Sequence, residues 1–256
     1  TAPVIILEGD EYLSSPIDRR PKFHLYQAHI GLISGIAWDH INVFPTFENY
    51  VEQFAIFANG IPKGGSLIWF NEDEELQKIA SELSDEVNQI AYGAPQYRIE
   101  NGKSVVIAEG KEYELQIFGK HNLCNLEGAR EVCKLLGVTT ENFYKAASTF
   151  SGAGRRLELI KATSDKAIYR DFAHSPSKLK ATVAAVKEQF PERKLVACME
   201  LHTFSSLSEN FLEQYAGTMN DADVPVVYFN PQTIAHKKLA PISTEQVAKA
   251  FENNNL

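Results

Sequence analysis

The sequence predicts an α/β protein in which a mostly parallel sheet with small antiparallel hairpins is followed by a second α/β domain. Three observations lead to this fold class. Short, continuous apolar runs are typical of strands buried on both faces of a parallel sheet. Amphipathic helical stretches lie between these runs, as in β-α-β units. One stretch, residues 91–118, instead alternates in polarity and carries glycines, which is typical of antiparallel hairpins.

The composition is that of a folded globular protein. The chain has 256 residues, of which 44% are hydrophobic and 23% charged, enough for one large domain or two ordinary ones. Its formal net charge of -8 argues against broad binding to nucleic acid or to an anionic membrane, because both need an excess of Lys and Arg. An anionic small molecule stays compatible with this charge, since a pocket can be locally basic.

No apolar run approaches the ~20 residues of a membrane-spanning helix, and no signal peptide is recognisable. We therefore expect a cytoplasmic protein with no membrane partner. The cysteines Cys124, Cys133 and Cys198 each lie in an apolar segment and show no C-x-x-C spacing. They are expected to be small buried core residues in a reducing compartment. The chain opens directly on an apolar run at residues 4–7, which is more common in a fragment than in an intact protein.

The first predicted elements are those of a parallel sheet. Residues 4–7 and 30–36 are continuous apolar runs and are predicted to be buried strands. Residues 47–57 have the pattern of an amphipathic helix, and residues 66–70 are predicted to be another strand after a turn. One face of the helix carries Tyr50, Phe54 and Phe57.

The pattern changes in the middle of the chain. Alternating polarity across residues 91–118 predicts antiparallel hairpins, with a type I′ turn at Asn101 and the glycine after it. Residues 123–136 have helical periodicity. Thr139 or Thr140 is expected to cap a further short helix.

Alternating β-α-β units follow a glycine-rich segment. The predicted elements are a strand at 167–172, a helix at 176–190, a strand at 195–199, a helix near Phe211 and a strand at 224–229. Ser175 is expected to cap the first of these helices and Pro176 to open it. We place the boundary between a domain of residues 1–150 and a domain of residues 151–256.

Carboxylates and histidines follow three of the predicted strands. Glu8 begins an acidic cluster after the first strand, and Asp39 and His40 follow the second. Asp171 and His174 lie at the end of the first strand of the second domain. Because ligands gather at the carboxyl ends of parallel strands, these groups are candidates for a Mg²⁺ site beside phosphate. The alternatives are a solvated Asp-His turn and an acidic helix start.

Two further patterns have a functional and a structural interpretation. Asn122 and Asn125 lie one helical turn apart and could present amide groups to a purine edge; alternatively, Asn122 only caps the helix. Arg155 and Arg156 follow a glycine-rich hinge, where two guanidinium groups could clamp an anion. Alternatively, they are surface arginines, one of them paired with Glu158.

Five motifs, in the same order, resemble those of the Mur ligase family. Residues 4–11 resemble its E-A-D-E strand end, and residues 38–40 resemble its D-H metal motif. Residues 119–125 are similar to its G-x-H-N-x-x-N adenine motif. Residues 150–158 match F-x-G-x-x-x-R-x-E, and residues 171–176 resemble D-[YF]-[AG]-H-H-P. The resemblance runs over most of the chain.

This resemblance implies a fold and an activity. The first domain would be part of a central P-loop-type ATPase domain that lacks its P-loop. The second would be an incomplete Rossmann-like α/β C-terminal domain, so the chain would be truncated at both ends. The implied activity is that of a cytoplasmic bacterial ligase of peptidoglycan metabolism, with ATP and Mg²⁺ as cofactors. ATP phosphorylates the lactyl carboxylate of UDP-N-acetylmuramate to an acyl phosphate, and the amine of an amino acid or murein tripeptide attacks it to form an amide.

The resemblance also implies roles for individual residues. Glu8 and His40 would bind Mg²⁺. Arg156 would reach the γ-phosphate, and Asp171 would hold the nucleotide ribose or tether the C-terminal domain. His174 would lie near the acyl centre. The adenine would be framed by His121, Asn122 and Asn125. The catalytic set implied in this way is His40, Arg156, Asp171 and His174.

Within the family, residues 11–12 and 18–23 look most like the murein peptide ligase branch. That branch joins the recycled tripeptide L-Ala-γ-D-Glu-meso-diaminopimelate to UDP-N-acetylmuramate, and the alanine-adding branch is the close alternative. Ala55 lies where other branches carry a carbamylated lysine, which agrees with both of these branches. The family often has a substrate-binding Arg in the segment that corresponds to residues 200–205, and none occurs here. The acceptor amine is therefore left open.

Several family features are missing. No G-x-x-x-x-G-K-[ST] motif occurs, so we expect this chain alone not to turn over ATP, because the β- and γ-phosphates need that loop and its lysine. Ser175 replaces the second His of H-H-P, and Gly35 stands where the metal loop usually has Asn. The chain also stops before the final strand and helix expected of the family.

Two functions from other classes stay open. The chain could be a non-catalytic binding module that reuses the fold. It could also be a metal phosphohydrolase that uses Glu8, Asp39 and His40. We expect either a monomer or a weak homodimer.

Overall fold

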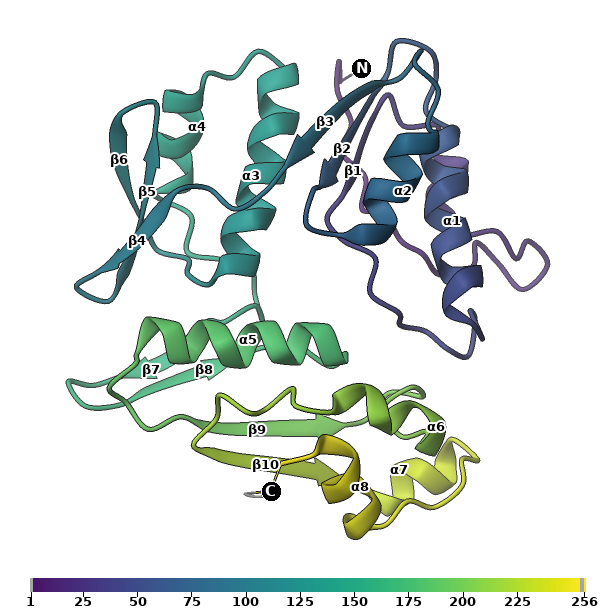
Figure 1. Cartoon of the computed structure of the whole chain (residues 1–256), viewed down its shortest axis with the longest axis vertical. Coiled ribbons are helices and arrows are strands. Elements are labelled where there is room, and N and C mark those ends of the chain that lie inside the picture. Colours follow the sequence, from purple (N-terminus) through teal and green to yellow (C-terminus); the bar gives the residue numbers. More distant parts are fainter. Residues whose placement is uncertain (1, 254–255) are drawn as a thin grey trace. The chain divides into compact units, whose positions relative to one another are not determined.

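The computed structural model describes residues 2–253 and residue 256, and Figure 1 shows the chain with its helices and strands labelled. Contacts divide the chain into two compact units, one ending at Gly93 and the other beginning at Ala94. The predicted division after residue 150 rests on a change in sequence pattern, whereas contacts group the hairpins with the segments that follow them. That division stays a prediction.

The first unit is built on a parallel sheet with the strand order β1-β2-β3. Its strands are β1 (Ile30–Ile33), β2 (Ser66–Phe70) and β3 (Asn88–Tyr92). The helices α1 (Phe47–Asn59) and α2 (Glu74–Glu82) connect them in turn. The predictions for β2 and α1 are confirmed, whereas β1 ends before the predicted limit at residue 36. Neither α2 nor β3 was predicted from the sequence pattern.

Side-chain caps fix where both helices of this unit begin. The Thr46 hydroxyl accepts a hydrogen bond from the Asn49 amide at the start of α1. At the start of α2, one carboxylate oxygen of Asp73 accepts from two amides of the first turn. Its other oxygen accepts from the Ile36 amide at 2.6 Å and so joins the loop after β1 to α2. Caps of this kind stabilise a helix by roughly 1 kcal/mol.

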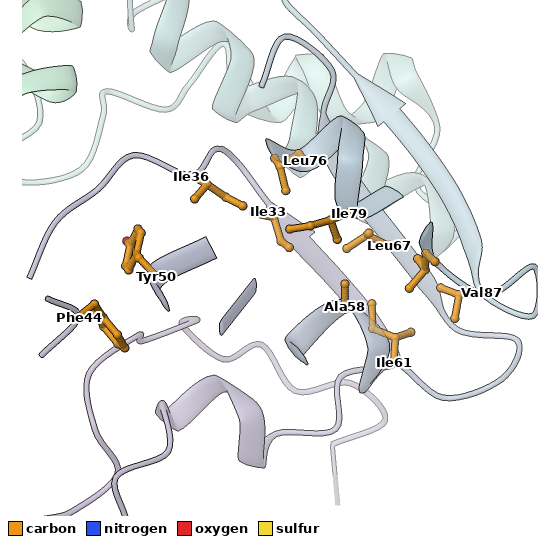
Figure 2. Close-up of a cluster of buried hydrophobic side chains, with 11 residues drawn as sticks. Ile33, Ile36, Phe44, Tyr50, Ala58, Ile61, Leu67, Leu76, Ile79 and Val87 are labelled. Carbon is orange, nitrogen blue, oxygen red and sulfur yellow. The ribbon is translucent and has the colours of Figure 1, made fainter. Parts of the chain in front are cut away.

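The core of the first unit lies between these helices and the sheet (Figure 2). Leu67 of β2 and Ala58 of α1 are fully buried in it. The predicted apolar face of α1 packs here, with Tyr50 buried and Phe54 and Phe57 partly buried. The buried members are Ile33, Ile36, Phe44, Tyr50, Ala58, Ile61, Leu67, Leu76, Ile79, Leu83 and Val87.

The predicted strand at residues 4–7 is wrong. The segment forms no strand, and its side chains are exposed, that of Ile6 to 86%. A continuous apolar run becomes a buried strand only beside a neighbouring strand that completes its hydrogen bonds. Within the described residues, β1 pairs with β2, and the sheet contains no strand on the other side of β1. Glu8 therefore follows an exposed segment and not the end of a strand.

The second unit begins with an antiparallel sheet, as predicted for this part of the chain. Its strands are β4 (Tyr97–Glu100), β5 (Lys103–Ala108) and β6 (Lys111–Leu115). Asn101 and Gly102 have φ angles of 51° and 72°. Both central residues of a type I′ turn need a positive φ, so the predicted turn is confirmed.

Two helices pack against this sheet. They are α3 (Lys120–Leu135) and α4 (Thr140–Ala147). The Thr139 hydroxyl caps α4 by accepting from the Asn142 amide, which confirms one of the two predicted caps. Leu123 of α3 and Tyr144 of α4 are buried in one cluster with Val106 of the sheet.

The remaining chain forms two small sheets with helices between and after the strands (Figure 1). The strands are β7 (Glu158–Ala162), β8 (Ala167–Arg170), β9 (Val196–Leu201) and β10 (Val224–Phe229). The helical segments are α5 (Pro176–Gln189), α6 (Glu209–Leu212), η2 (Glu213–Tyr215), α7 (Pro231–His236) and α8 (Thr244–Phe251). The parallel pair of β9 and β10 agrees with the predicted β-α-β pattern.

The first of these sheets differs from the prediction. The strand predicted at 167–172 corresponds to β8, which pairs antiparallel with β7, a strand that the sequence analysis missed. The loop between them, residues 163–166, is too short for the crossover that a parallel pair requires. The helix that follows is confirmed: Ser175 is the N-cap of α5 and Pro176 its first residue, although no side-chain hydrogen bond is made at the cap.

The expectation that all three cysteines are buried is correct for one of them. Cys124 is buried, Cys133 is partly exposed and Cys198 is exposed, and all three are free thiols. Cys198 lies opposite Val226 in the sheet of β9 and β10, on a face that leaves Val226 42% exposed. An apolar sequence context therefore did not place this residue inside. None of the helices in the described residues is long and apolar enough to cross a membrane.

Candidate functional site

His40 lies in the loop after β1 among acidic and aromatic side chains. Its φ of 56° is in the left-handed region, which is uncommon for residues other than glycine. Its Nε2 lies 2.9 Å from Oε1 of Glu11, and its ring centroid lies 4.4 Å from that of Tyr12. The Asp39 carboxylate accepts the His40 backbone amide at 2.7 Å and is buried. The Asp-His pair is therefore not a solvated turn.

Glu8 makes a different set of contacts. Its side chain is exposed, and its carbonyl accepts from the Asp10 amide at 3.1 Å. The acidic cluster does not start an α-helix, because the next helical segment is the 3-10 helix η1 (Lys22–Leu25). Glu11, a member of the predicted acidic cluster, is thus the carboxylate that lies beside His40. A metal site that joins Glu8 to His40 stays a prediction.

The carboxylates near His40 affect the pKa of two tyrosines. Burial raises the pKa of Tyr12, and the charges of Asp39 and Glu11 raise it further. The pKa of Tyr50 is raised mainly by burial and additionally by the same two carboxylates. The surroundings of His40 are therefore anionic, which favours a bound cation.

The donor groups in this part of the chain suit a weakly held magnesium ion. Among residues 2–253 and 256, no three side chains of His, Cys, Asp or Glu are arranged to hold a metal. Mg²⁺ needs fewer protein ligands, because it keeps several waters and is commonly bound through one or two carboxylates together with phosphate oxygens. The carboxylates of Glu11 and Asp39 beside His40 are of the ligand type that Mg²⁺ prefers, and a magnesium site there stays a prediction.

His121 occupies the first turn of α3 in the second unit. Burial lowers the pKa of its imidazole, and the charge of Asp171 opposes that shift in part. The ring is therefore neutral at pH 7 and can accept a hydrogen bond or stack on a planar ligand. Its position depends on Gly119, where the chain has a φ of 90° and where a Cβ would lie 2.5 Å from Cβ of Ala185.

The two predicted adenine-contacting asparagines lie on the same helix. The side-chain amide of Asn122 donates to the carbonyl of Phe118 at 2.9 Å. The alternative in which Asn122 caps the helix is wrong, because the N-cap position of α3 is Gly119. Asn125 is exposed one turn further along α3.

The loop before β7 has an unusual backbone. Arg155 and Leu157 have φ angles of 57° and 45°, so both residues beside Arg156 are in the left-handed region. The Arg156 guanidinium lies 5.7 Å from the ring centroid of Phe172. Glu158 accepts the Arg155 backbone amide and pairs with the Arg170 guanidinium at 2.9 Å. Both arginines are exposed, as the alternative of two surface arginines predicted, but the side chain that pairs with Glu158 is that of Arg170.

Asp171 joins that loop to the end of β8. Its Oδ2 accepts the backbone amide of Leu157 at 2.6 Å, and its Oδ1 accepts the amide of Ala173 at 2.7 Å. The Phe172 amide donates to the carbonyl of Arg155 at 2.8 Å. The two segments that carry Arg156 and Asp171 are thus held together by backbone and carboxylate hydrogen bonds.

His174 forms an aromatic group with Phe172 and His202. Its Nδ1 lies 2.9 Å from the carbonyl of Phe172, so this nitrogen carries the donated proton. Its ring centroid is 5.0 Å from that of Phe172 and 6.1 Å from that of His202. The Tyr215 hydroxyl donates to the carbonyl of His174. Phe172 and His202 were not among the predicted site residues; the signal for His202 was its position directly after β9.

The structure thus brings together part of the predicted set. Arg156, Asp171 and His174 lie on two joined segments, and the charge of Asp171 acts on His121. His40 lies in the other unit, with Glu11 as its partner. Their meeting on one nucleotide stays a prediction.

This arrangement of a parallel-sheet unit, hairpins and a further α/β segment is that of known ligase domains. Residues 6–133 match the model of the Mur ligase middle domain, and residues 155–254 match that of the Mur ligase glutamate ligase domain. The chain belongs to the Mur ligase family.

Individual relatives agree with this assignment. The UDP-N-acetylmuramate--L-alanine ligase of Desulfitobacterium hafniense (strain Y51) is 28% identical over 261 residues, covering 95% of this chain and 58% of that protein. The same-named enzyme of Caldicellulosiruptor bescii is 29% identical, covering 87% of this chain and 50% of that protein. The chain thus spans about half the length of the curated relatives it matches.

Solved structures share the fold. A murein peptide ligase from Psychrobacter arcticus 273-4 superimposes with a TM-score of 0.59 at 22% identity, covering 95% of this chain and 51% of that one. MurF from Acinetobacter baumannii gives a TM-score of 0.67 at 17% identity, covering 90% of this chain and 53% of that one. The mixed α/β fold of the Mur ligases, expected from the sequence, is confirmed.

Proposed function

We propose that this chain is the nucleotide-binding and substrate-binding part of an ATP-dependent amide ligase that acts on UDP-N-acetylmuramate in the cytoplasm. The observation that carries the proposal is the match of two consecutive Mur ligase domains in order along the chain. The grouping of Arg156, Asp171 and His174 on joined segments supports it, because the resemblance assigns these residues to the reaction.

The reaction would proceed in two steps, phosphoryl transfer and then amide formation. An oxygen of the lactyl carboxylate attacks the γ-phosphorus of ATP, and ADP leaves with the electron pair of the broken bond. The amine nitrogen then attacks the carbonyl carbon of the acyl phosphate, loses a proton and expels inorganic phosphate. Both partners in the first step are anionic, so the protein contributes chiefly charge neutralisation and positioning.

The residues of this chain would divide these tasks. The Arg156 guanidinium would neutralise the γ-phosphate, and His174 would lie near the acyl carbon. The neutral His121, with Asn122 and Asn125, would receive the adenine. Mg²⁺, when bound, would supply further charge neutralisation on the phosphates. The resemblance assigns it to Glu8 and His40, and the Glu11 and Asp39 carboxylates beside His40 could serve as further ligands.

The acceptor amine has two candidates. The residues at 11–12 and 18–23 favour the murein tripeptide L-Ala-γ-D-Glu-meso-diaminopimelate. The names of the sequence relatives instead favour L-alanine. We propose the tripeptide as the acceptor, because residues 11–12 and 18–23 are features of this chain itself. L-alanine is the second candidate.

The test uses the longer protein that contains this chain. Purified protein is incubated with ATP, Mg²⁺ and UDP-N-acetylmuramate, together with the tripeptide, L-alanine or no amine, and phosphate release and amide product are measured. Amide formation with one amine and little phosphate release without it would support the proposal. Equal phosphate release without any amine would indicate a phosphohydrolase, and binding without turnover a non-catalytic module.

The 256-residue chain alone is proposed to be inactive. It contains no G-x-x-x-x-G-K-[ST] loop, whose amides and lysine hold the β- and γ-phosphates. In the same assay it should release no phosphate above the background of a denatured sample. Ligation by this chain would contradict the proposal that the loop is needed.

A further inference from the structure

The parallel pair of β9 and β10 has one apolar face that is exposed. Cys198 of β9 lies opposite Val226 of β10, and both are exposed. Two residues away on the same face, Val196 is 56% exposed on β9 and Tyr228 is 57% exposed on β10. We call this surface the outer face, and its members are Val196, Cys198, Glu200, Val224, Val226 and Tyr228.

The other face of the same two strands is packed. Met199 and Leu201 of β9 are buried, as is Pro225 of β10. Parallel strands are normally covered on both faces. The outer face is therefore left uncovered by the residues that the structure describes, and an exposed apolar patch of this kind marks an interaction site.

The row of exposed side chains along β9 begins at Lys194 and has opposite charges at its two ends. Residues 194, 196, 198 and 200 are exposed and alternate with less exposed residues, so their side chains lie on one side of the chain. Lys194 lies near Asp223, whose carboxylate accepts from the Lys187 ammonium at 2.9 Å. Two ammonium groups and one carboxylate leave this end positive, whereas Glu200 makes the other end negative.

This charge pattern is complementary to itself. A two-fold axis that lies between two outer faces and crosses the strands at Ala197 stacks β9 on β9 of a second copy in the opposite direction. Lys194 then faces Glu200 of the second copy, and Val196 faces Cys198 of the second copy. Because Ala197 lies opposite Pro225, Val224 faces Val226 of the second copy in the same way. Apolar groups thus meet at the centre and opposite charges at both ends.

We infer that the outer face binds the outer face of a second copy of this chain and forms a two-fold dimer. The two-fold arrangement is the commonest one among protein oligomers, since a single self-complementary surface is enough to build it. A surface of two short strands is small, so the dimer is weak. This inference does not depend on the proposed ligase activity.

Sedimentation equilibrium of the 256-residue chain tests the dimer directly. Dimers should form as the concentration rises from about 1 to 500 μM, and Val226→Lys should raise the dissociation constant by about tenfold or more, because it encloses an ammonium group in the apolar centre. Val138→Lys is the matched control, since this valine is 38% exposed beyond the end of α3 and should leave the dimer unchanged. A chain that stays monomeric at about 500 μM, or an equal effect of both variants, would overturn the inference.

Charge reversal tests which residues face each other. Lys194→Glu alone, or Glu200→Lys alone, places like charges together at both ends and should weaken the dimer by about tenfold. In an equimolar mixture of the two variants, a mixed dimer again has opposite charges at both ends and should form about as tightly as the unchanged dimer. If the mixture dimerises no better than either variant alone, the proposed two-fold arrangement is wrong.

The Cys198 thiol reports on the outer face itself. In the 256-residue chain its reaction with iodoacetamide should be about tenfold slower when about nine-tenths of the chain is dimeric, because only the free chain exposes it. Cys133 of α3 is the control in the same sample and should react at a constant rate. A Cys198 rate that does not change with concentration would contradict the inference. In the longer protein, slow reaction of Cys198 at every concentration without dimers would show that another segment of that protein covers the face, which overturns the inference there.

Discussion

Nε2 of His40 lies 2.9 Å from Oε1 of Glu11, and the backbone of His40 has a positive φ. A strained residue whose ring is held by a carboxylate is typical of a functional position, because strain of this kind persists only where the surroundings hold it. Asp39 adds a second carboxylate oxygen 4.0 Å from the same nitrogen. This imidazole therefore lies in a negative field, which favours a bound cation.

His40→Ala in the longer protein is expected to raise the Mg²⁺ concentration for half-maximal ligation by about tenfold or more, since removing a group that orients or binds the ion costs that much in metal sites. The measurement is the initial rate of phosphate release against Mg²⁺ concentration. His29→Ala is the matched control, because His29 is an exposed histidine of the same unit. An unchanged Mg²⁺ dependence in His40→Ala would contradict the assignment of His40 to the magnesium site.

Gly119→Ala is expected to destabilise the chain by about 2–4 kcal/mol, because it adds both backbone strain and a steric clash. The glycine has a φ of 90°, and the new Cβ would lie 2.5 Å from Cβ of Ala185. Urea unfolding followed by circular dichroism measures the change. Gly110→Ala is the control: its φ is 74°, but a Cβ there meets nothing within 4 Å, so a loss of about 1 kcal/mol is expected. Equal losses in the two variants would show that the contact with Ala185 is unimportant.

Arg130→Ala is expected to destabilise the chain by about 2–4 kcal/mol, because it leaves two largely buried carboxylates of α3 without this partner. Arg130 bonds Glu127 at 2.9 Å and Glu131 at 2.6 Å, and the Tyr144 hydroxyl also donates to Glu127. Tyr144→Phe, which removes a single hydrogen bond, should cost about 1–2 kcal/mol. Urea unfolding measures both losses.

The control for these variants is Arg98→Ala. Arg98 pairs with two carboxylates on the exposed face of the antiparallel sheet, where solvent screens the charges. The Arg98→Ala variant should therefore lower the free energy of unfolding much less than Arg130→Ala does. A similar loss in both variants would contradict the importance of burial.

The His121 imidazole is expected to titrate below its ordinary value of 6.5, because burial disfavours its charged form. The unfolded chain then binds more protons than the folded chain below pH 6.5. His121 therefore reduces stability as the pH falls from 6.5 through its folded pKa, and the loss is complete below that pKa. Urea unfolding between pH 7 and pH 5 should show a smaller pH dependence in His121→Gln than in the unchanged chain.

The effect of Asp171 on His121 gives a separate measurement. The carboxylate charge opposes the effect of burial, so Asp171→Asn should lower the pKa of His121 further. Titration of the imidazole by NMR measures this value. A pKa that is unchanged or raised in Asp171→Asn would show that the carboxylate does not act on the ring.

Local chemistry was enough to predict many elements. The cap at Thr139, the Asn-Gly turn at residue 101 and the first residue of α5 at Pro176 all have the expected structure. Each depends on a few consecutive residues whose hydrogen-bonding and backbone preferences are strong. The apolar face of α1 was predictable for the same reason, since helical periodicity places its members on one side.

Strands that depend on a neighbouring strand were not predictable from their own sequence. Residues 4–7 and 66–70 both have the apolar pattern of a buried strand, yet only the second has neighbouring strands on both sides and forms one. In the same way, β8 was recognised but its antiparallel partner β7 was not, because three of the five residues of β7 are apolar without any strict alternation. A strand requires hydrogen bonds from outside its own segment, and the sequence of that segment does not contain them.

The sequence by itself determined the family, the order of its motifs and the residue types that could bind a nucleotide. These are patterns in the order of residues along the chain, so they do not depend on which residues are in contact. Only the tertiary structure decided which of those residues touch. It placed the His40 imidazole beside the Glu11 carboxylate and the Asp171 carboxylate beside the backbone amide of Leu157. The reason is physical: hydrogen bonds act over about 3 Å, and distances of that size between residues far apart in sequence exist only after the chain has folded.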